Sequence, residues 1–121
     1  RLLPWCTSYE NIALVQKKRL ACPQTLAWLE RMELAAWRDS YPHELSGGMQ
    51  RRVALGRACA FGGDILLLDE PFTGIDEALR ERLVPHIKSA AKLIVLVTHD
   101  SEDAELFKAE KLVLDATQTN C

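Results

Sequence analysis

Apolar residues recur with a helical period in the first part of the chain. A capping box, Thr7–Glu10, predicts a helix running to about Lys18, and apolar side chains spaced three or four residues apart after Pro23 predict a second helix. Trp37–Glu44 contains the pair Tyr-Pro, and the residue before a proline resists the helical conformation. This stretch is therefore predicted to be a linker.

A stronger helical pattern follows Ser46-Gly47-Gly48 and ends at Gly62-Gly63. A glycine inside a helix costs about 1 kcal/mol relative to alanine, so the glycine in its middle predicts close packing. One apolar stripe along this helix is formed by Met49, Val53, Gly56 and Ala60.

The second part of the chain alternates between strand and helix patterns. Ile65–Leu68 and Leu93–Thr98 are unbroken aliphatic runs, which predict parallel strands covered on both faces, and Lys111–Ala116 is interpreted as a third strand. Residues 76–92 and 100–108 are predicted helices, although Pro85 should kink or interrupt the first of them. The fold class is therefore α/β, with a helical part (residues 1–63) ahead of a parallel-sheet part (residues 64–121).

Composition narrows the class of protein. The 121 residues are 48% hydrophobic and 26% charged, which is typical of a globular core, and no aliphatic run approaches the roughly 20 residues of a membrane span. No secretory signal is visible, and the first residue is Arg1 rather than Met, which suggests a segment whose beginning lies elsewhere. The stretch 45–63 carries three arginines and no acid, which could attract an anion or form a solvated helix face. This is too little positive charge for nucleic-acid binding.

The cysteines and histidines do not form a metal motif. The four cysteines lack any C-x-x-C pair, and none of the three histidines lies three or four residues from another histidine or a cysteine. Small buried thiols in a reducing compartment are the preferred interpretation.

Polar groups follow both predicted strands directly. Asp69 and Glu70 end the first aliphatic run, and His99 follows the second, so all three should lie at the ligand-binding edge of a parallel sheet. One carboxylate could hold Mg²⁺ through water, and the other could orient or deprotonate an attacking water. A tight turn, residues 71–76, then ends in the helix-capping Asp76. Ser46, Gly47 and Gly48 open a helix whose exposed N–H groups could receive phosphate oxygens.

The order and spacing of these motifs resemble the nucleotide-binding domain of ATP-binding-cassette (ABC) ATPases. Ser-Gly-Gly-Met-Gln (46–50) is followed by Asp-Glu-Pro (69–71), whose Asp69 lies 19 positions after Gln50, then by Gly-Ile-Asp (74–76) and Thr-His-Asp (98–100). The opening Leu-Pro-Trp (3–5) and the stretch Tyr-Pro-His-Glu (41–44) are similar to bacterial importers of nitrate, sulfonate or taurine. The resemblance spans essentially the whole chain.

The resemblance implies ATP and Mg²⁺ as ligands and a P-loop NTPase core. In this family two nucleotide-binding domains sandwich ATP and act on transmembrane permease subunits, at the cytoplasmic face of the cell membrane. The family motifs imply that Ser46, Gly47, Gly48 and Gln50 form the signature motif, which contacts a γ-phosphate bound by the partner domain. By the same resemblance, Asp69 holds Mg²⁺, Glu70 is the general base, His99 contacts the γ-phosphate, and Asp76 communicates across the dimer.

The chain departs from the family pattern at one essential motif. It contains no G-x-x-x-x-G-K-[ST] phosphate loop, so it looks like the C-terminal part of such an ATPase and is expected to bind ATP weakly on its own. In the family, the strand carrying that loop separates Leu93–Thr98 from Lys111–Ala116, so both strands are expected to have unpaired edges. We expect these edges to pair with another chain, swap domains, or displace the last strand.

Two further hypotheses stay open beside a transporter ATPase. One is a soluble ABC ATPase of DNA repair or translation, although the chain lacks long coiled-coil or basic insertions. The other is a non-catalytic remnant acting as an interaction module. Restoring ATPase activity by adding an N-terminal half would separate the remnant from the transporter subunit.

Overall fold

The first helices form where the sequence places their caps. The structure is a computed structural model that describes residues 1–16, 23–110 and 112. Helix α1 (Ser8–Ala13) begins at the predicted capping box, in which Thr7 Oγ1 accepts a hydrogen bond from the Glu10 N–H and the Glu10 carboxylate accepts one from the Thr7 N–H. The helix ends earlier than predicted, and Lys18 lies outside the described residues. Helix α2 (Pro23–Arg31) starts at the predicted proline.

Helix α3 (Gly47–Ala60) is the central element of the helical part and packs against both α1 and α2. The predicted linker before α3 is partly ordered into two short 3₁₀ helices, Ala35–Trp37 and Pro42–Glu44. The prediction of close packing at Gly56 is confirmed. A Cβ there would lie 3.1 Å from Met32 Cγ and 3.2 Å from Ile12 Cδ1, so a side chain at this position would crowd the α1–α2–α3 interface.

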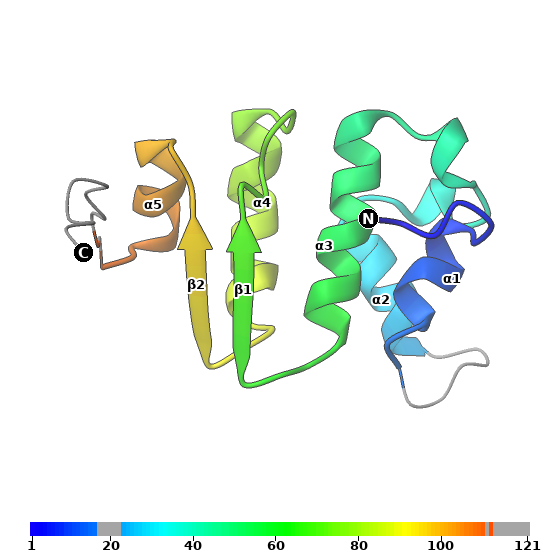
Figure 1. Cartoon of the computed structure of the whole chain (residues 1–121), viewed down its shortest axis with the longest axis horizontal. Coiled ribbons are helices and arrows are strands. Elements are labelled where there is room, and N and C mark those ends of the chain that lie inside the picture. The colour runs from blue at the N-terminus through cyan, green and yellow to red at the C-terminus, as the bar shows by residue number, and fades with distance from the viewer. Residues whose placement is uncertain (17–22, 111, 113–121) are drawn as a thin grey trace, which may run out of the picture.

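Two parallel strands follow, β1 (Ile65–Asp69) and β2 (Leu93–Val97), paired in register from Ile65–Leu93 to Asp69–Val97. Helix α4 (Glu77–Lys88) connects them, and α5 (Ser101–Phe107) follows β2. Figure 1 shows the two strands beside α3, with α4 and α5 behind them. One core joins the helical part to the sheet; its side chains from β1, α4 and α5 include Leu66, Leu68, Leu83, Ile87 and Phe107.

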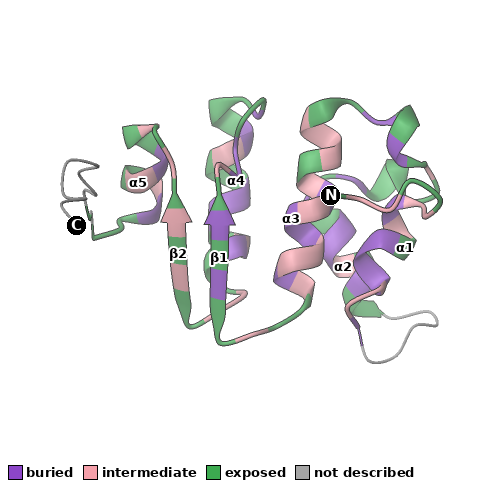
Figure 2. Ribbon diagram, in the orientation of Figure 1, coloured by how far each residue is buried: buried purple, intermediate pink, exposed green. Residues whose placement is uncertain are grey.

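The prediction that both faces of the sheet are covered is wrong for the described residues. The side chains of β1 alternate between exposed and buried, and those of β2 between exposed and half-buried (Figure 2). Uninterrupted aliphatic residues make both faces apolar, but the described helices α4 and α5 lie on one face only. The aliphatic side chains on the open face are Ile65, Leu67, Leu93, Val95 and Val97.

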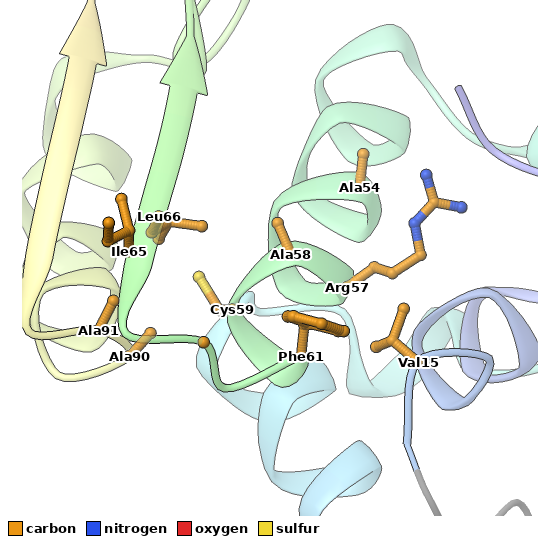
Figure 3. Close-up of a pocket in the computed structure, with 11 residues that line it drawn as sticks. Val15, Ala54, Arg57, Ala58, Cys59, Phe61, Ile65, Leu66, Ala90 and Ala91 are labelled. Carbon is orange, nitrogen blue, oxygen red and sulfur yellow. The ribbon is translucent and has the colours of Figure 1, made fainter.

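An open groove of about 320 Å³ adjoins this face, between α3 and the start of β1 (Figure 3). Phe61, which is 69% exposed, and Ile65 lie along it together with small side chains such as Ala58 and Ala90. The groove lies at the opposite end of β1 from Asp69. It is therefore separate from the residues to which the sequence assigns chemistry.

Helix α4 is continuous through Pro85, so of the two predicted effects of this proline, a kink or an interruption, the interruption is wrong. The proline lies in the last turn, and the carbonyl that loses its donor belongs to Glu81, an exposed residue that water can reach.

Among the described residues β2 pairs only with β1, so its outer edge has no strand partner there. The predicted third strand, Lys111–Ala116, lies almost entirely outside the described residues. No described helix is both long and apolar enough to cross a bilayer.

Two substitutions in β1 test whether one face of the sheet is covered and the other is open. Leu66→Ala should lower the free energy of unfolding by about 2 to 4 kcal/mol, because it opens a cavity in the core. Leu67→Ala, at a side chain that is 72% exposed, should change it by no more than about 0.5 kcal/mol. Urea unfolding of the two variants measures both values. Equal costs would contradict the open face.

Candidate functional site at the strand ends

The carboxyl ends of the two strands bring the sequence-predicted polar residues together. Asp69 is the last residue of β1 and pairs with Val97 of β2, so Glu70 and His99 lie just beyond the same edge of the sheet. The Asp100 carboxylate caps α5 by accepting a hydrogen bond from the Glu102 N–H. Helix α5 therefore begins two residues after His99. This edge is the usual position of ligand sites in parallel sheets.

Glu70 has left-handed backbone geometry, with φ of 45°. This turn, rather than the regular geometry of β1, sets the direction of the Glu70 side chain. Such a conformation costs a non-glycine residue on the order of 1 to 3 kcal/mol and needs support from its surroundings. The Glu70 N–H donates to the Val97 carbonyl (2.8 Å), and the Glu70 carbonyl accepts a hydrogen bond from Arg51 Nη1 (3.2 Å).

The Glu70 side chain is bound to His99. One carboxylate oxygen, Oε1, lies 2.7 Å from His99 Nδ1 and also accepts the His99 backbone N–H at 3.0 Å. The hydrogen bond from His99 lowers the pKa of Glu70, and the same bond raises the pKa of His99. The His99 side chain is 84% exposed and that of Glu70 is 34% exposed, so both reach solvent at the strand ends.

Two partly buried ion pairs that share Arg80 hold the segment that carries His99. Arg80 Nη1 on α4 lies 2.8 Å from Asp100 Oδ2 and 3.0 Å from Asp103 Oδ1. Asp103 is 3% exposed and also accepts a hydrogen bond from Thr98 Oγ1 at 3.0 Å. The residues on both sides of His99 are therefore fixed to α4, while the His99 ring stays open to solvent.

The N-terminus of α3 offers free backbone donors at the same end of the molecule. Ser46 is exposed and caps the helix, its Oγ accepting the Met49 N–H at 3.2 Å. The N–H groups of Gly47 and Gly48 find no acceptor among the described residues. A helix N-terminus with unpaired donors favours an anion.

Gly48 also has a packing role that the sequence did not reveal. A Cβ on Gly48 would lie 2.8 Å from the carbonyl oxygen of Gly74, so only glycine lets the two backbones meet. Gly74 belongs to the turn that follows Glu70 and leads to Asp76. The exposed Asp76 carboxylate accepts the Leu79 N–H at 3.0 Å and so caps α4.

Gln50, a predicted nucleotide contact, is used inside the chain. Its Nε2 donates to the carbonyls of Pro42, at 2.8 Å, and Leu45, at 3.3 Å. The side chain therefore fixes the loop that precedes Ser46. The structure does not bring it into the group formed by Asp69, Glu70 and His99.

Asp69 is the described carboxylate best placed for a cation. It is exposed, and no described residue gives its side chain a hydrogen bond or an ion pair. Magnesium commonly takes one or two protein carboxylates and completes its shell with water and phosphate oxygens, so this single acid fits Mg²⁺. Within the described residues no three His, Cys, Asp or Glu side chains form a metal centre. Burial raises the pKa of the Cys59 thiol to about 12, in line with the interpretation of this cysteine as a small buried thiol.

Each of the three arginines of α3 donates to a main-chain carbonyl. Arg51 donates to the Glu70 carbonyl, Arg52 to the carbonyls of Met32 (2.7 Å) and Glu33 (3.2 Å), and Arg57 to that of Arg1 (2.7 Å). Sequence reasoning missed Arg51 and Arg80 as residues of the site. Each arginine donates a hydrogen bond to a residue 19 or more positions away in the chain, and a local sequence pattern cannot predict such a contact.

Comparison with known proteins gives a consistent assignment. The sequence model described as "ABC transporter" matches residues 1–73. The chain is 37% identical over 120 residues to the aliphatic sulfonates import ATP-binding protein SsuB of Bacillus cereus (strain ZK / E33L), covering 94% of this chain and 47% of the relative. It is also 37% identical over 122 residues to the taurine import ATP-binding protein TauB of Rhizobium johnstonii, covering 93% and 47%. The chain thus spans about half the length of these relatives.

Solved structures agree with this fold. The dimeric structure of MJ0796, a bacterial ABC transporter cassette, superimposes with a TM-score of 0.76 and 32% identity over 88% of this chain and 51% of that chain. A dimeric post-hydrolysis state of the same cassette, bound to ADP and Pi, gives a TM-score of 0.75. The α/β fold predicted from the sequence is confirmed by these neighbours.

The Glu70–His99 pair makes a prediction about pH. Because the pKa of His99 is raised and that of Glu70 is lowered, both groups are charged between the two values. The contribution of the pair to stability should fade as the pH rises through the raised pKa of His99 or falls through the lowered pKa of Glu70. Glu70→Gln should return the His99 pKa toward its usual value, as followed by NMR titration of the imidazole. His43 and His86 serve as internal controls, and identical His99 curves in the two proteins would exclude the pair.

Proposed function

Because this chain belongs to the ABC transporter family, we propose that it contributes to the ATP-binding subunit of a membrane importer and supplies half of an ATP-hydrolysing site. The observation that carries the proposal is the meeting of two groups at one end of the molecule. The Ser46-capped start of α3 touches the turn after Glu70, through Gly48–Gly74 and through Arg51. An anion-binding helix end and a carboxylate–histidine pair therefore face the same space.

The phosphate-binding role falls to the start of α3. We infer that Ser46 Oγ and the N–H groups of Gly47 and Gly48 bind the γ-phosphate of an ATP molecule held by a second nucleotide-binding domain. The unpaired donors and the positive end of the helix dipole support this role. Gln50 supports the same motif indirectly, because it fixes the loop before Ser46.

The hydrolytic role falls to the strand ends. Asp69, free and exposed, would hold Mg²⁺, which when bound neutralises charge developing on the phosphate oxygens. Glu70 would accept a proton from, or orient, the attacking water, and His99 would contact the γ-phosphate. Oε1 of Glu70 is already bonded to His99, whereas Oε2 has no partner among the described residues and would face the water. Asp76 and the turn before it would communicate between the two nucleotide-binding domains of the dimer.

The partners follow from the names of the relatives and from the dimeric neighbour. The proposed assembly holds two nucleotide-binding domains and transmembrane permease subunits, with this chain on the cytoplasmic side of the membrane. The relatives import sulfonates and taurine, so we propose an importer of that type. Residues 1–63 would form the helical subdomain and residues 64–121 a part of the ATPase core.

An interaction module without catalysis is the second candidate. It is favoured by the open apolar face of β1 and β2 and by the lack of a G-x-x-x-x-G-K-[ST] motif in these 121 residues. The two candidates differ in whether a supplied phosphate loop produces ATP hydrolysis.

Complementation tests the proposed function. The chain, joined behind the N-terminal half of an SsuB-type relative that carries a phosphate loop, should hydrolyse ATP in the presence of Mg²⁺. Glu70→Gln should lower the rate by about 10²- to 10⁴-fold, the range for loss of a general base. Glu105→Gln, at an exposed acid on α5, is the matched control and should keep the rate. Equal rates for Glu70→Gln and the unmodified protein would refute the proposed role of Glu70, and no hydrolysis by any of them would favour the interaction module.

Residues 1–121 by themselves should bind ATP weakly or not at all. The chain offers a phosphate cap and a carboxylate but no loop that surrounds the β- and γ-phosphates. Isothermal titration with Mg-ATP measures this directly. Tight, magnesium-dependent binding to the isolated chain would show that the missing motif is not required.

A further inference from the structure

We propose that Arg51 is a positioning residue for Glu70, holding the glutamate by its main-chain carbonyl and linking it to the helix that Ser46 caps. The inference deepens the proposed function, because it concerns the same site. It rests on three observations: the unusual backbone of Glu70, the donors that surround it, and the other contact between α3 and the same turn.

The backbone of Glu70 needs support from outside its own segment. Its φ of 45° lies in the left-handed region, which a side chain with a Cβ disfavours. On the amino side, the Val97 carbonyl accepts the Glu70 N–H at 2.8 Å. On the carbonyl side, Arg51 Nη1 donates at 3.2 Å, and Thr73 Oγ1 reaches the same oxygen only at 3.4 Å. Arg51 is thus the principal donor to the Glu70 carbonyl.

The direction of the Glu70 carboxylate follows from this backbone. With the residue in its left-handed turn, Oε1 meets both the ring and the N–H of His99. If the Glu70 carbonyl rotated away, the side chain would leave His99. Arg51 therefore acts on the carboxylate through the main chain and does not itself touch it.

Arg51 also places Glu70 relative to the start of α3. It lies one turn beyond Gly48, the residue whose missing side chain lets α3 approach the Gly74 carbonyl. The same turn of chain is thus held at Glu70 by a hydrogen bond and at Gly74 by backbone packing. These two contacts hold the turn after β1 against the first turn of α3, and the one at Glu70 is the contact made by Arg51.

Arg57 offers a matched control on the same helix. Its Nη2 donates to the Arg1 carbonyl at 2.7 Å and its Nη1 to Asn11 Oδ1 at 3.4 Å, so it ties α3 to the N-terminal segment and not to the strand ends. Arg51 is exposed, so its replacement removes the hydrogen bond without opening the core.

The experiment compares Arg51→Met with Arg57→Met in the ¹⁵N-labelled chain, without nucleotide. Arg51→Met should speed hydrogen exchange at the Glu70 and His99 amides by about 2- to 10-fold, the effect of losing one net hydrogen bond. At fixed pH it should also move the ¹⁵N shift of His99 Nδ1 toward the value seen in Glu70→Gln. Arg57→Met should leave these signals in place and speed exchange at Leu3, whose N–H donates to Asn11. Arg51→Gln serves as the second variant if Arg51→Met does not fold.

Exchange at Glu70 and His99 within twofold of the unmodified chain in the Arg51 variant would overturn the inference. In the complemented ATPase, Arg51→Met should lower kcat with little change in KM, because Arg51 contacts Glu70 and is not proposed to contact the nucleotide. A change confined to KM would also overturn the inference about Arg51. Failure of the proposed function can be told apart from failure of the inference about Arg51. Complete absence of hydrolysis in the unmodified complemented protein would refute that function, while the exchange experiment, which uses no ATP, would still decide the role of Arg51.

Discussion

The close approach of the first turn of α3 to the turn after β1 is the constraint on which the rest of the site depends. Gly48 meets the Gly74 carbonyl with no room for a methyl group between them, and Arg51 donates to the Glu70 carbonyl. These contacts join a helix from the first half of the chain to a strand from the second. Without them, the unpaired N–H groups at the helix start and the carboxylate at the strand end would be two unrelated surface features.

The exposed side chains of the site are held in place by neighbouring side chains that bond within the chain. Ser46, Asp69 and the His99 ring are exposed, while the residues around them carry the structural work: Gln50 fixes the loop before Ser46, and Arg80 fixes the segment around His99. Paired groups hold the frame, and the exposed groups stay open to solvent. The left-handed backbone of Glu70 shows where this frame is under strain.

Local features were predictable from the sequence, and non-local ones were not. The helix caps at Thr7 and Asp76 were predicted from the sequence, because each side chain bonds a residue only three positions away, and the structure confirms both. The left-handed turn at Glu70 was missed, because it depends on Arg51 and Val97, which lie far from it in the chain. The open face of the sheet was missed for a related reason, since an aliphatic run shows that a face is apolar but not that a second layer covers it. The grouping of Asp69, Glu70 and His99 was predictable because parallel strands end at one edge, a rule of topology rather than of contact.

The most direct measurement of the central claim is photolabelling of the complemented ATPase with an ATP analogue that carries an azido group on its γ-phosphate. Mass spectrometry of the labelled peptides shows which residues of this chain surround that phosphate. If these residues surround the γ-phosphate, label is expected on the peptide containing Ser46–Met49 and on the one containing His99. Label confined to other peptides, such as those lining the groove near Phe61 and Ile65, would contradict the central claim.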